Sequence, residues 1–283
     1  MDLTRSIVVG YDDTSASAAA VRWAAALARS TGVGLRIVHA WSWPLLGSGL
    51  AGVPVMDSAG PRNQAMQLLD AAAEAIAARE PDVQVHTDLL PGTARDVLDQ
   101  ISQTTEMLVV GTRGLGPVLS TLLGSVSRGI LHDAGCPVAV IRSEQHTAGP
   151  VLVAADGSPS AAEAVEVAAD LASSWAVPLR IVHVRPDGPG RSGGGTGAID
   201  ARTRSLLDGA SAQALAAHDG LTVETRVLEG RSAADGLLTA AAGARILVMG
   251  HRGHSHGPLG STVHATVLHA TGNVVVVRRH LAE

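Results

Sequence analysis

The sequence lacks two residue types entirely and has very few aromatic residues. It contains no phenylalanine and no lysine, and aromatic residues make up only 2% of its 283 positions. Few aromatics disfavour the RNA-binding folds that stack bases on aromatic side chains. The absence of lysine excludes a Walker A loop, a Schiff-base lysine and the lysine of a protein kinase. The core must therefore be built from Val, Leu, Ile and Ala, which favours thin α/β layers.

Strong positive charge, cysteine pairs and membrane-length apolar runs are also missing. The net charge of −5 with no basic run argues against nucleic acid as a partner. A single cysteine excludes an internal disulfide framework and suits the reducing cytoplasm, where we expect the protein to act. The first residues enter a strand pattern directly, without the features of a signal peptide. Residues 40–56 carry two prolines and three glycines, which predicts a loop and no membrane partner.

Internal repeats determine the domain organisation. Residues 6–12 (SIVVGYD) recur at 151–156 (VLVAAD), and residues 35–40 (LRIVHA) recur at 179–184 (LRIVHV). Further along, residues 107–114 (MLVVGTRG) match residues 246–253 (ILVMGHRG) in the same order. The chain is therefore predicted to hold two copies of one domain, at 1–146 and 148–283, with a polar seam at 143–149.

Each copy alternates apolar runs with longer amphipathic segments. After the run at 7–10, the spacing of Val21, Ala24, Ala25 and Ala28 predicts a helix packed on a sheet. Further helices are expected at 63–79, 94–102 and 125–134. Runs that are apolar throughout, rather than alternating, indicate strands covered on both faces. The fold class is therefore α/β, with two tandem Rossmann-like domains, each an open five-stranded parallel sheet flanked by helices.

In such sheets, ligands bind beyond the carboxyl ends of the strands. Asp12 follows the first strand, Ala40 ends the second, and a glycine-rich loop from Gly111 to Gly124 follows the fourth and leads into a helix at Ser125. Glycines let the backbone approach an anion, and free N–H groups at the start of a helix face it. The alternative is that the glycines only make turns and that Ser125 only caps its helix.

The spacing Gly111-x2-Gly114-x9-Gly124-Ser125 resembles the G-2x-G-9x-G-[S/T] motif of the ATP-binding branch of universal stress proteins. The segments VVGYDDTSASAAAVRWA and GSVSRGILHDAGCPVAVI are similar to that family's first strand and helix and its last helix and strand. The resemblance covers the whole chain as a tandem pair. It implies a stress-response or regulatory protein that binds ATP with Mg²⁺, without naming a signalling partner.

The resemblance also assigns residues to a nucleotide site. It places Asp12 and the backbone of Ala40 at the adenine end. Around the ribose and phosphates it places Gly111, Gly114, Gly124, Ser125 and Val126. It further implies a homodimer formed through a last strand, at 138–141 or 274–277.

The second copy keeps the site but shortens its loop. The corresponding residues are Asp156, Val184, Gly250, Gly253, Gly260 and Ser261. Six residues separate Gly253 from Gly260, where the first copy has nine, so the loop follows a different path. We expect weaker or altered binding there, for a shorter phosphate chain. Arg113 and Arg252 either neutralise phosphate charge or are ordinary loop charges.

Catalysis and metal binding are the alternatives to simple nucleotide binding. Hydrolysis of ATP needs a group that orients water and a charge clamp, and neither is evident near the first loop. A binding module is therefore expected, with a slow ATPase or phosphoryl-transfer enzyme as the alternative. A histidine-rich stretch (His251, His254, His256, His264 and His269) raises a third, metal-binding hypothesis, but no cysteine or acidic residue lies between 250 and 270. No metal site is predicted. His39 and His183 are interpreted as structural, and Cys136 as a core residue.

Overall fold

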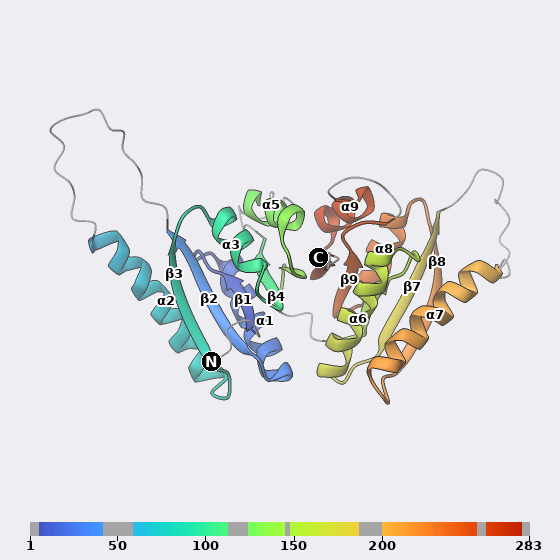
Figure 1. The fold of residues 1–283 in the computed structure, drawn as a ribbon, viewed down its shortest axis with the longest axis horizontal. Coiled ribbons are helices and arrows are strands. Elements are labelled where there is room, and N and C mark those ends of the chain that lie inside the picture. The colour runs from blue at the N-terminus through green and yellow to red at the C-terminus, as the bar shows by residue number, and fades with distance from the viewer. Residues whose placement is uncertain are drawn as a thin grey trace, which may run out of the picture.

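The computed structural model describes residues 6–41, 59–112, 124–144, 148–186, 200–253 and 259–278. Strands and helices alternate along both halves (Figure 1). The first half contains β1 (Ser6–Gly10), α1 (Ser15–Thr31), β2 (Gly34–Trp41), α2 (Ala59–Arg79), β3 (Val85–Pro91), α3 (Ala94–Ser102), β4 (Met107–Gly111), α5 (Ser125–Asp133) and β5 (Val138–Ile141). The second contains β6 (Val151–Ala154), α6 (Pro159–Ser174), β7 (Leu179–Pro186), α7 (Ala201–Ala217), β8 (Val223–Gly230), α8 (Ala233–Ala241), β9 (Ile246–Gly250), α9 (Ser261–His269) and β10 (Val274–Val277). None of the helices in these ranges is long and apolar enough to cross a membrane.

All ten strands form one sheet in the order β3-β2-β1-β4-β5-β10-β9-β6-β7-β8. Within each half the neighbouring strands are parallel. The halves meet where β5 pairs with β10 in the antiparallel direction, with Ala139 opposite Val275. The predicted α/β fold with five parallel strands per half is therefore confirmed. The two sheets are not separate, because the last strands join them into one mixed sheet.

The pairing of β5 with β10 bears on the expected homodimer. β5 lies between β4 and β10, and β10 lies between β5 and β9. The hydrogen-bonding edges of both last strands are therefore filled within one chain. The prediction that a second chain adds to one of these strands is corrected accordingly: the strand edge that such a dimer needs is not open.

Two helical layers cover the sheet. Buried residues of α1, α2, α6 and α7 pack on one face, and those of α3, α5, α8 and α9 pack on the other. Each apolar cluster runs through both halves, so the core is continuous across the junction. Strand residues such as Val8 and Leu152 are fully buried, as expected for parallel strands covered on both faces.

Local sequence explains where the helices begin and end. Thr14 caps α1 by accepting a hydrogen bond from the backbone N–H of Ser17, and Ser158 caps α6 in the same way. Gly32, in the left-handed conformation at φ +72°, ends α1. The helix predicted at 63–79 begins earlier, at Ala59. Its Pro61 lies in the first turn, where no intrahelical N–H is needed.

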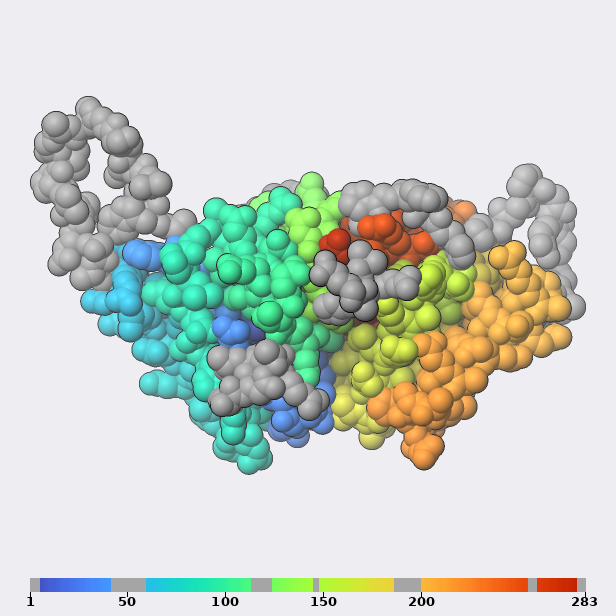
Figure 2. All heavy atoms as spheres, in the orientation of Figure 1, coloured from blue at the N-terminus to red at the C-terminus, as the bar shows by residue number. Residues whose placement is uncertain are grey.

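An aromatic and cationic contact joins the halves on the face covered by α1 and α6. The rings of Trp23 and Trp175 meet edge to face with centroids 6.0 Å apart, and the guanidinium of Arg245 lies 4.3 Å from the Trp175 centroid. Figure 2 shows the first half, coloured blue to green, meeting the second half, coloured yellow to red, at the middle of the molecule. The two halves therefore pack as one body around the β5–β10 pair.

Candidate functional site

Each half has a pocket at the carboxyl ends of its first, second and fourth strands. The pocket of the first half has a volume of about 170 Å³ and that of the second about 300 Å³. Of the predicted residues, the first is lined by Asp12, Ala40, Gly111, Gly124 and Val126. The second is lined by Asp156, Val184, Gly250, Gly253, Gly260 and Ser261. The structure thus brings most of the predicted site residues together, twice.

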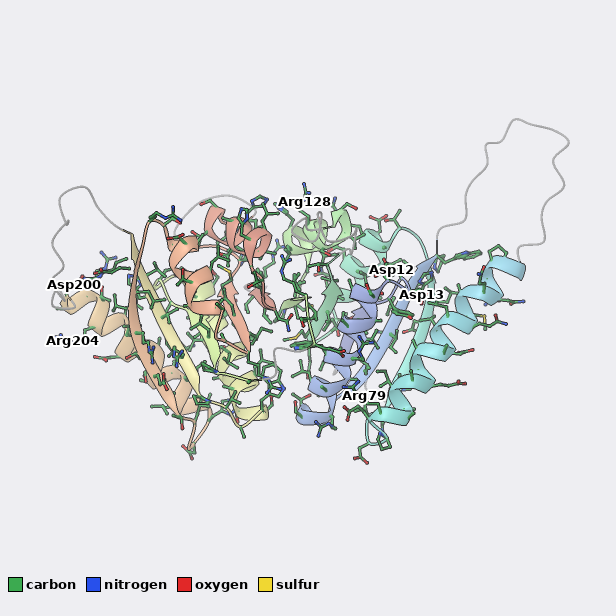
Figure 3. The ribbon with its side chains drawn as sticks, turned by 180° about the vertical axis from the view of Figure 1, so that it is seen from behind. Asp12, Asp13, Arg79, Arg128, Asp200 and Arg204 are labelled. Carbon is green, nitrogen blue, oxygen red and sulfur yellow. The ribbon has the colours of Figure 1, made fainter. Side chains whose placement is uncertain are left out.

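The aspartate after each first strand is held by the start of the next helix. Asp12 Oδ1 accepts hydrogen bonds from the Thr14 hydroxyl at 2.7 Å and the Thr14 N–H at 3.3 Å. In the second half, Asp156 Oδ1 accepts from the N–H of Ser158 at 2.9 Å. Figure 3 places Asp12 at the end of its half opposite Arg79. Each carboxylate is thereby fixed at the mouth of its pocket.

Gly111 and Gly250 have a role that the sequence interpretation did not assign. A Cβ on Gly111 would lie 2.6 Å from the backbone carbonyl atoms of Ala16, and one on Gly250 would lie 2.6 Å from those of Ser160. These glycines therefore let the first turn of α1 or α6 pack directly against the end of β4 or β9. Their described contacts are with a helix, not with open space for a ligand.

The helices that begin at the pockets have no side-chain caps. The N-cap of α5 is Gly124 and that of α9 is Gly260, and neither helix start has a side-chain cap hydrogen bond. The alternative that Ser125 only caps its helix is therefore wrong. Ser125 is exposed and does not line the first pocket, whereas Val126 and Ser127 of the same turn do. The free N–H groups suit an anion.

Two equivalent positions hold residues of different size in the two halves, and only the strand residue of each pair lines its pocket. The first half has Ala40 at the end of β2 and Val97 on α3, and the second half has Val184 and Gly236 at the equivalent positions. A Cβ on Gly236 would lie 2.6 Å from Val184 Cγ1. The larger strand residue is thus accommodated by a smaller helix residue.

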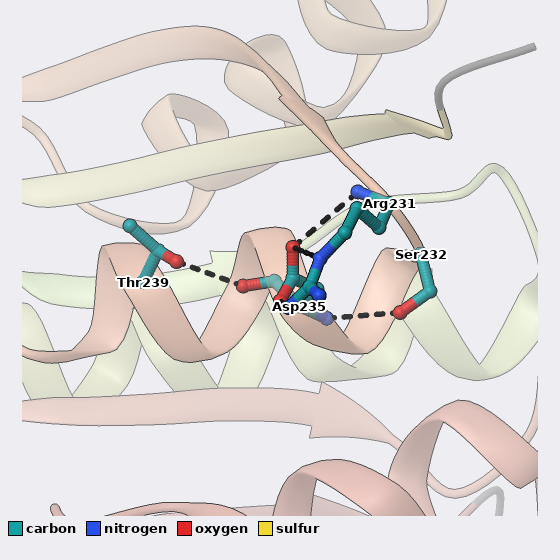
Figure 4. Close-up of polar contacts among 4 residues, drawn as sticks. All are labelled: Arg231, Ser232, Asp235 and Thr239. Atoms are coloured by element: carbon teal, nitrogen blue, oxygen red, sulfur yellow. Dashed lines mark hydrogen bonds and ion pairs between the residues drawn. The ribbon is translucent and has the colours of Figure 1, made fainter.

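Arg252 is the basic side chain that lines the second pocket. Its Nε is buried and has no hydrogen-bond partner. Arg231, which precedes α8, does not line this pocket; it forms a salt bridge with Asp235 at 2.8 Å (Figure 4), and this hydrogen bond lowers the pKa of the Asp235 carboxyl. The two hypotheses for Arg252, phosphate neutralisation and an ordinary loop charge, both stay predictions. Arg113 and Gly114 lie outside the described residues.

Gly253 lies directly against the aspartate of the second pocket. A Cβ at this position would come within 2.5 Å of Asp156 Oδ2. The glycine therefore allows the loop after β9 to approach the carboxylate. By contrast, a Cβ on Gly260 would meet nothing closer than 3.5 Å.

The histidines divide into structural residues and one buried outlier. His39 Nδ1 donates to the carbonyl of Tyr11 at 2.7 Å, and His183 Nδ1 donates to that of Ala155 at 2.8 Å, which confirms their structural interpretation. His251 is 7% exposed, and its Nδ1 has no partner. Burial, followed by the charges of Arg252 and Arg278, lowers the pKa of His251 to about 4.

Neither Cys136 nor the described histidines of α9 line the two pockets. No group of three or more His, Cys, Asp or Glu side chains there is arranged to hold a metal. His264 and His269 are exposed on α9, and His254 and His256 lie outside the described residues. Cys136 is buried, as predicted, and burial raises the pKa of its thiol to about 12.

Several polar residues of the first pocket were not identified from the sequence. Thr14, Ser17, Thr112 and Ser127 all line it. Ser127 Oγ donates to the carbonyl of Gly111 at 3.1 Å, which ties α5 to the end of β4. Ser127 lies three positions after the predicted site residue Gly124, so helical spacing was the signal available for it. Thr112 directly follows the predicted site residue Gly111, so its position next to that glycine was the signal available for it.

The model of the Universal stress protein family matches residues 4–142 and again residues 148–278. The chain is 32% identical over 290 residues to "Universal stress protein Rv2623" of Mycobacterium tuberculosis, covering 96% of each protein. A solved universal stress protein from Archaeoglobus fulgidus shares the fold, with a TM-score of 0.75 and 22% identity over 97% of this chain and 98% of that one. A universal stress protein solved in complex with cAMP matches 46% of this chain and 96% of its own, with 27% identity and a TM-score of 0.39. The chain belongs to the universal stress protein family, as a tandem member with two halves.

Proposed function

We propose that this protein binds ATP, accompanied by Mg²⁺, in the pocket of its first half and acts as a stress-response regulator. The observation that carries the proposal is the arrangement of that pocket. An aspartate held at the end of β1 faces the start of α5, whose N–H groups have no side-chain cap. A carboxylate suits the amino group of adenine or a ribose hydroxyl, and free helix N–H groups suit phosphate.

Mg²⁺ would enter with the phosphates rather than by a protein cage. The only acidic side chain lining the described part of the first pocket is Asp12, and Oδ1 of that residue already accepts two hydrogen bonds from Thr14. Magnesium in nucleotide sites commonly takes its ligands from the phosphates and water. Such an ion would neutralise phosphate charge without dedicated protein ligands.

The second pocket suits a shorter phosphate chain. Its loop after Gly253 is three residues shorter than that of the first half. A hydrogen bond of 2.9 Å from Gly260 N–H to the His251 carbonyl closes this loop at its base. Arg252 supplies one positive charge at the same end. We infer that this pocket binds an adenine nucleotide more weakly than the first, with a preference for a monophosphate.

Binding, rather than turnover, is the activity that the described residues support. The titratable side chains among those lining the first pocket are Tyr11 and Asp12. The pKa of Tyr11 is raised, mainly by burial, which keeps the phenol protonated at neutral pH. Neither residue is a base poised to orient water for attack on a phosphate. The cytoplasmic location stays a prediction from the sequence.

Calorimetric titration of the full chain with Mg-ATP and with AMP tests this proposal. The full chain is required, because isolated halves would expose the paired edges of β5 and β10. We expect two sites of different affinity, with Asp12→Ala weakening binding at the tighter site and Asp156→Ala weakening binding at the other. Mass spectrometry of ligand released from the denatured protein would identify the nucleotide. Failure of the wild type to bind any adenine nucleotide at millimolar concentration would overturn the proposal.

A further inference from the structure

The two arginines that follow the last strands contact the opposite halves of the molecule. Arg142 follows β5, and its guanidinium donates a hydrogen bond to the carbonyl of Val267 in α9. Arg278 follows β10, and its Nη1 donates to the carbonyls of His132 at 2.6 Å and Ala134 at 3.4 Å, at the end of α5. Each arginine thus connects its own half to a helix of the other.

Both arginines bind carbonyl groups at the ends of these helices. The final intrahelical hydrogen bond of α9 runs from Ala270 N–H to the Thr266 carbonyl, so Val267 lies beyond it. In α5 the final bond runs from Ala134 N–H to the Ile130 carbonyl, so His132 lies beyond it. Carbonyls in this last turn have no helical partner and carry partial negative charge. A guanidinium supplies both the hydrogen-bond donor that these carbonyls lack and a positive charge opposite their partial negative charge.

The junction holds Arg142 in place. Its backbone N–H donates to Asn273 Oδ1 at 2.9 Å, and Ser143 N–H donates to the same oxygen at 3.2 Å. Asn273 Nδ2 returns a hydrogen bond of 2.8 Å to the Ser143 carbonyl. The residue before β10 therefore fixes the residue after β5. In consequence, the Arg142 side chain leaves the junction from a defined position toward α9.

The same two helices begin at the two pockets. Gly124 at the start of α5 lines the first pocket, and Gly260 at the start of α9 lines the second. Each helix has nine residues. At 1.5 Å per residue, a helix of this length extends roughly 13 Å and moves as a rigid rod. A contact that fixes the last turn also fixes the N–H groups of the first turn.

We propose that Arg142 and Arg278 are positioning residues for the nucleotide sites, and that they act crosswise. Arg278, from the second half, holds the phosphate-facing helix of the first pocket. Arg142, from the first half, holds that of the second pocket. The inference rests on the proposed function, since it concerns how well each helix presents its N–H groups to phosphate.

The test uses chains in which one site is weakened by loss of its aspartate, so that binding at the other site dominates. In an Asp156→Ala chain, where the first site remains, Arg278→Gln should weaken binding of Mg-ATP about three- to tenfold, and Arg142→Gln should leave it within twofold. In an Asp12→Ala chain, where the second site remains, the two substitutions should exchange their effects on AMP binding. Arg278→Lys and Arg142→Lys, which keep a donor and the charge, should restore most of the affinity.

Arg36→Gln and Arg180→Gln are the matched controls. Each removes the same charge from one half and breaks an arginine–carboxylate pair, with Asp88 or Glu224 respectively. Neither arginine lines a nucleotide pocket. Both controls should leave the two affinities unchanged.

Hydrogen exchange of the unliganded wild-type chain and its single variants gives a second readout. Arg278→Gln should speed exchange of the amides in the first turn of α5 but not of α9, and Arg142→Gln should do the reverse. Substitutions that act only on their own half, or on both helices alike, would overturn the inference.

If a Gln variant does not fold, its Lys variant is measured instead. We then expect a loss of affinity smaller than threefold, still at the site of the opposite half. If the wild type binds no nucleotide, the proposed function fails, while the exchange pattern still decides the crosswise contact.

Discussion

The two pockets are built from equivalent elements but fill equivalent positions differently. On the second strand of each half and on the helix after the third strand, the first half has Ala40 and Val97, and the second half has Val184 and Gly236 at the equivalent positions. The larger residue is on the helix in the first half and on the strand in the second half.

The phosphate ends of the pockets differ more. In the first half, Ser127 Oγ ties α5 to the Gly111 carbonyl at 3.1 Å. In the second half, Val263 occupies the position of Ser127, and the Gly260 N–H bonds to the His251 carbonyl at 2.9 Å instead. The helix start is anchored by a side chain in one half and by the backbone in the other. Divergence in ligand preference is thus expected at this end.

The largest expected effect is that of Asp12→Ala on the first site. Asp12 is exposed in the free chain, and its loss would leave a donor of the bound nucleotide unpaired; such a loss costs about 1–3 kcal/mol, or roughly a ten- to hundredfold loss of ATP affinity. Calorimetry on the full chain measures it. Asp12→Asn, which keeps an acceptor for Thr14, should bind better than the alanine variant. A lower melting temperature with unchanged affinity would mean that Asp12 only orders the start of α1.

The exchange of residue sizes between these two positions can be tested with Gly236→Val. The new side chain would collide with Val184, and overpacking of this kind costs about 1–3 kcal/mol of unfolding free energy. Adding Val184→Ala recreates the pair found in the first half and should recover most of the loss. Denaturant unfolding of the two single variants and the double variant gives the coupling energy. Additive effects would show that the two positions do not compensate each other.

The second half has His251 at the position that Thr112 occupies in the first half. This difference predicts a pH dependence of the free energy of unfolding that only the second half contributes. The pKa of His251 is lowered to about 4, so the unfolded chain, with a pKa near 6.5, binds the proton first as the pH falls. The stability that depends on a neutral His251 is therefore fully present above pH 6.5 and is lost as the pH falls toward 4. We expect the free energy of unfolding to fall by about 2 kcal/mol between pH 7 and pH 5. Unfolding free energies of wild type and His251→Thr at both pH values measure it. Equal pH slopes in the two chains would contradict the prediction.

The smallest effect is expected from Gly253→Ala at the second site. Its Cβ would force the Asp156 carboxylate to move, and we expect about a fivefold loss of AMP affinity there, or roughly 1 kcal/mol. Gly260→Ala, which has room for a Cβ, is the matched control and should bind as the wild type does. The first site should not respond to either change. Equal losses in both variants would show that the contact with Asp156 is irrelevant.

The repeated runs in the sequence were sufficient to predict the order of elements, because apolar strands and amphipathic helices have distinct periodicities. They also located Asp12, Gly124 and their counterparts at the strand ends. The joining of β5 to β10 could not be predicted, since an unpaired last strand can pair within the chain or with another chain. The packing role of Gly111 depends on where α1 lies in space. The crosswise contacts of Arg142 and Arg278 likewise require the tertiary structure.

The pairing of the last strands has a consequence for how the two sites can change. In an assembly of two identical chains, every substitution appears in both copies, so a side chain that suits one site is imposed on the other. Here the two halves are joined in one chain, and each half has a sequence of its own. Val184 and Gly236 can therefore vary together while Ala40 and Val97 stay as they are. The covalent link frees one half to specialise without altering its neighbour.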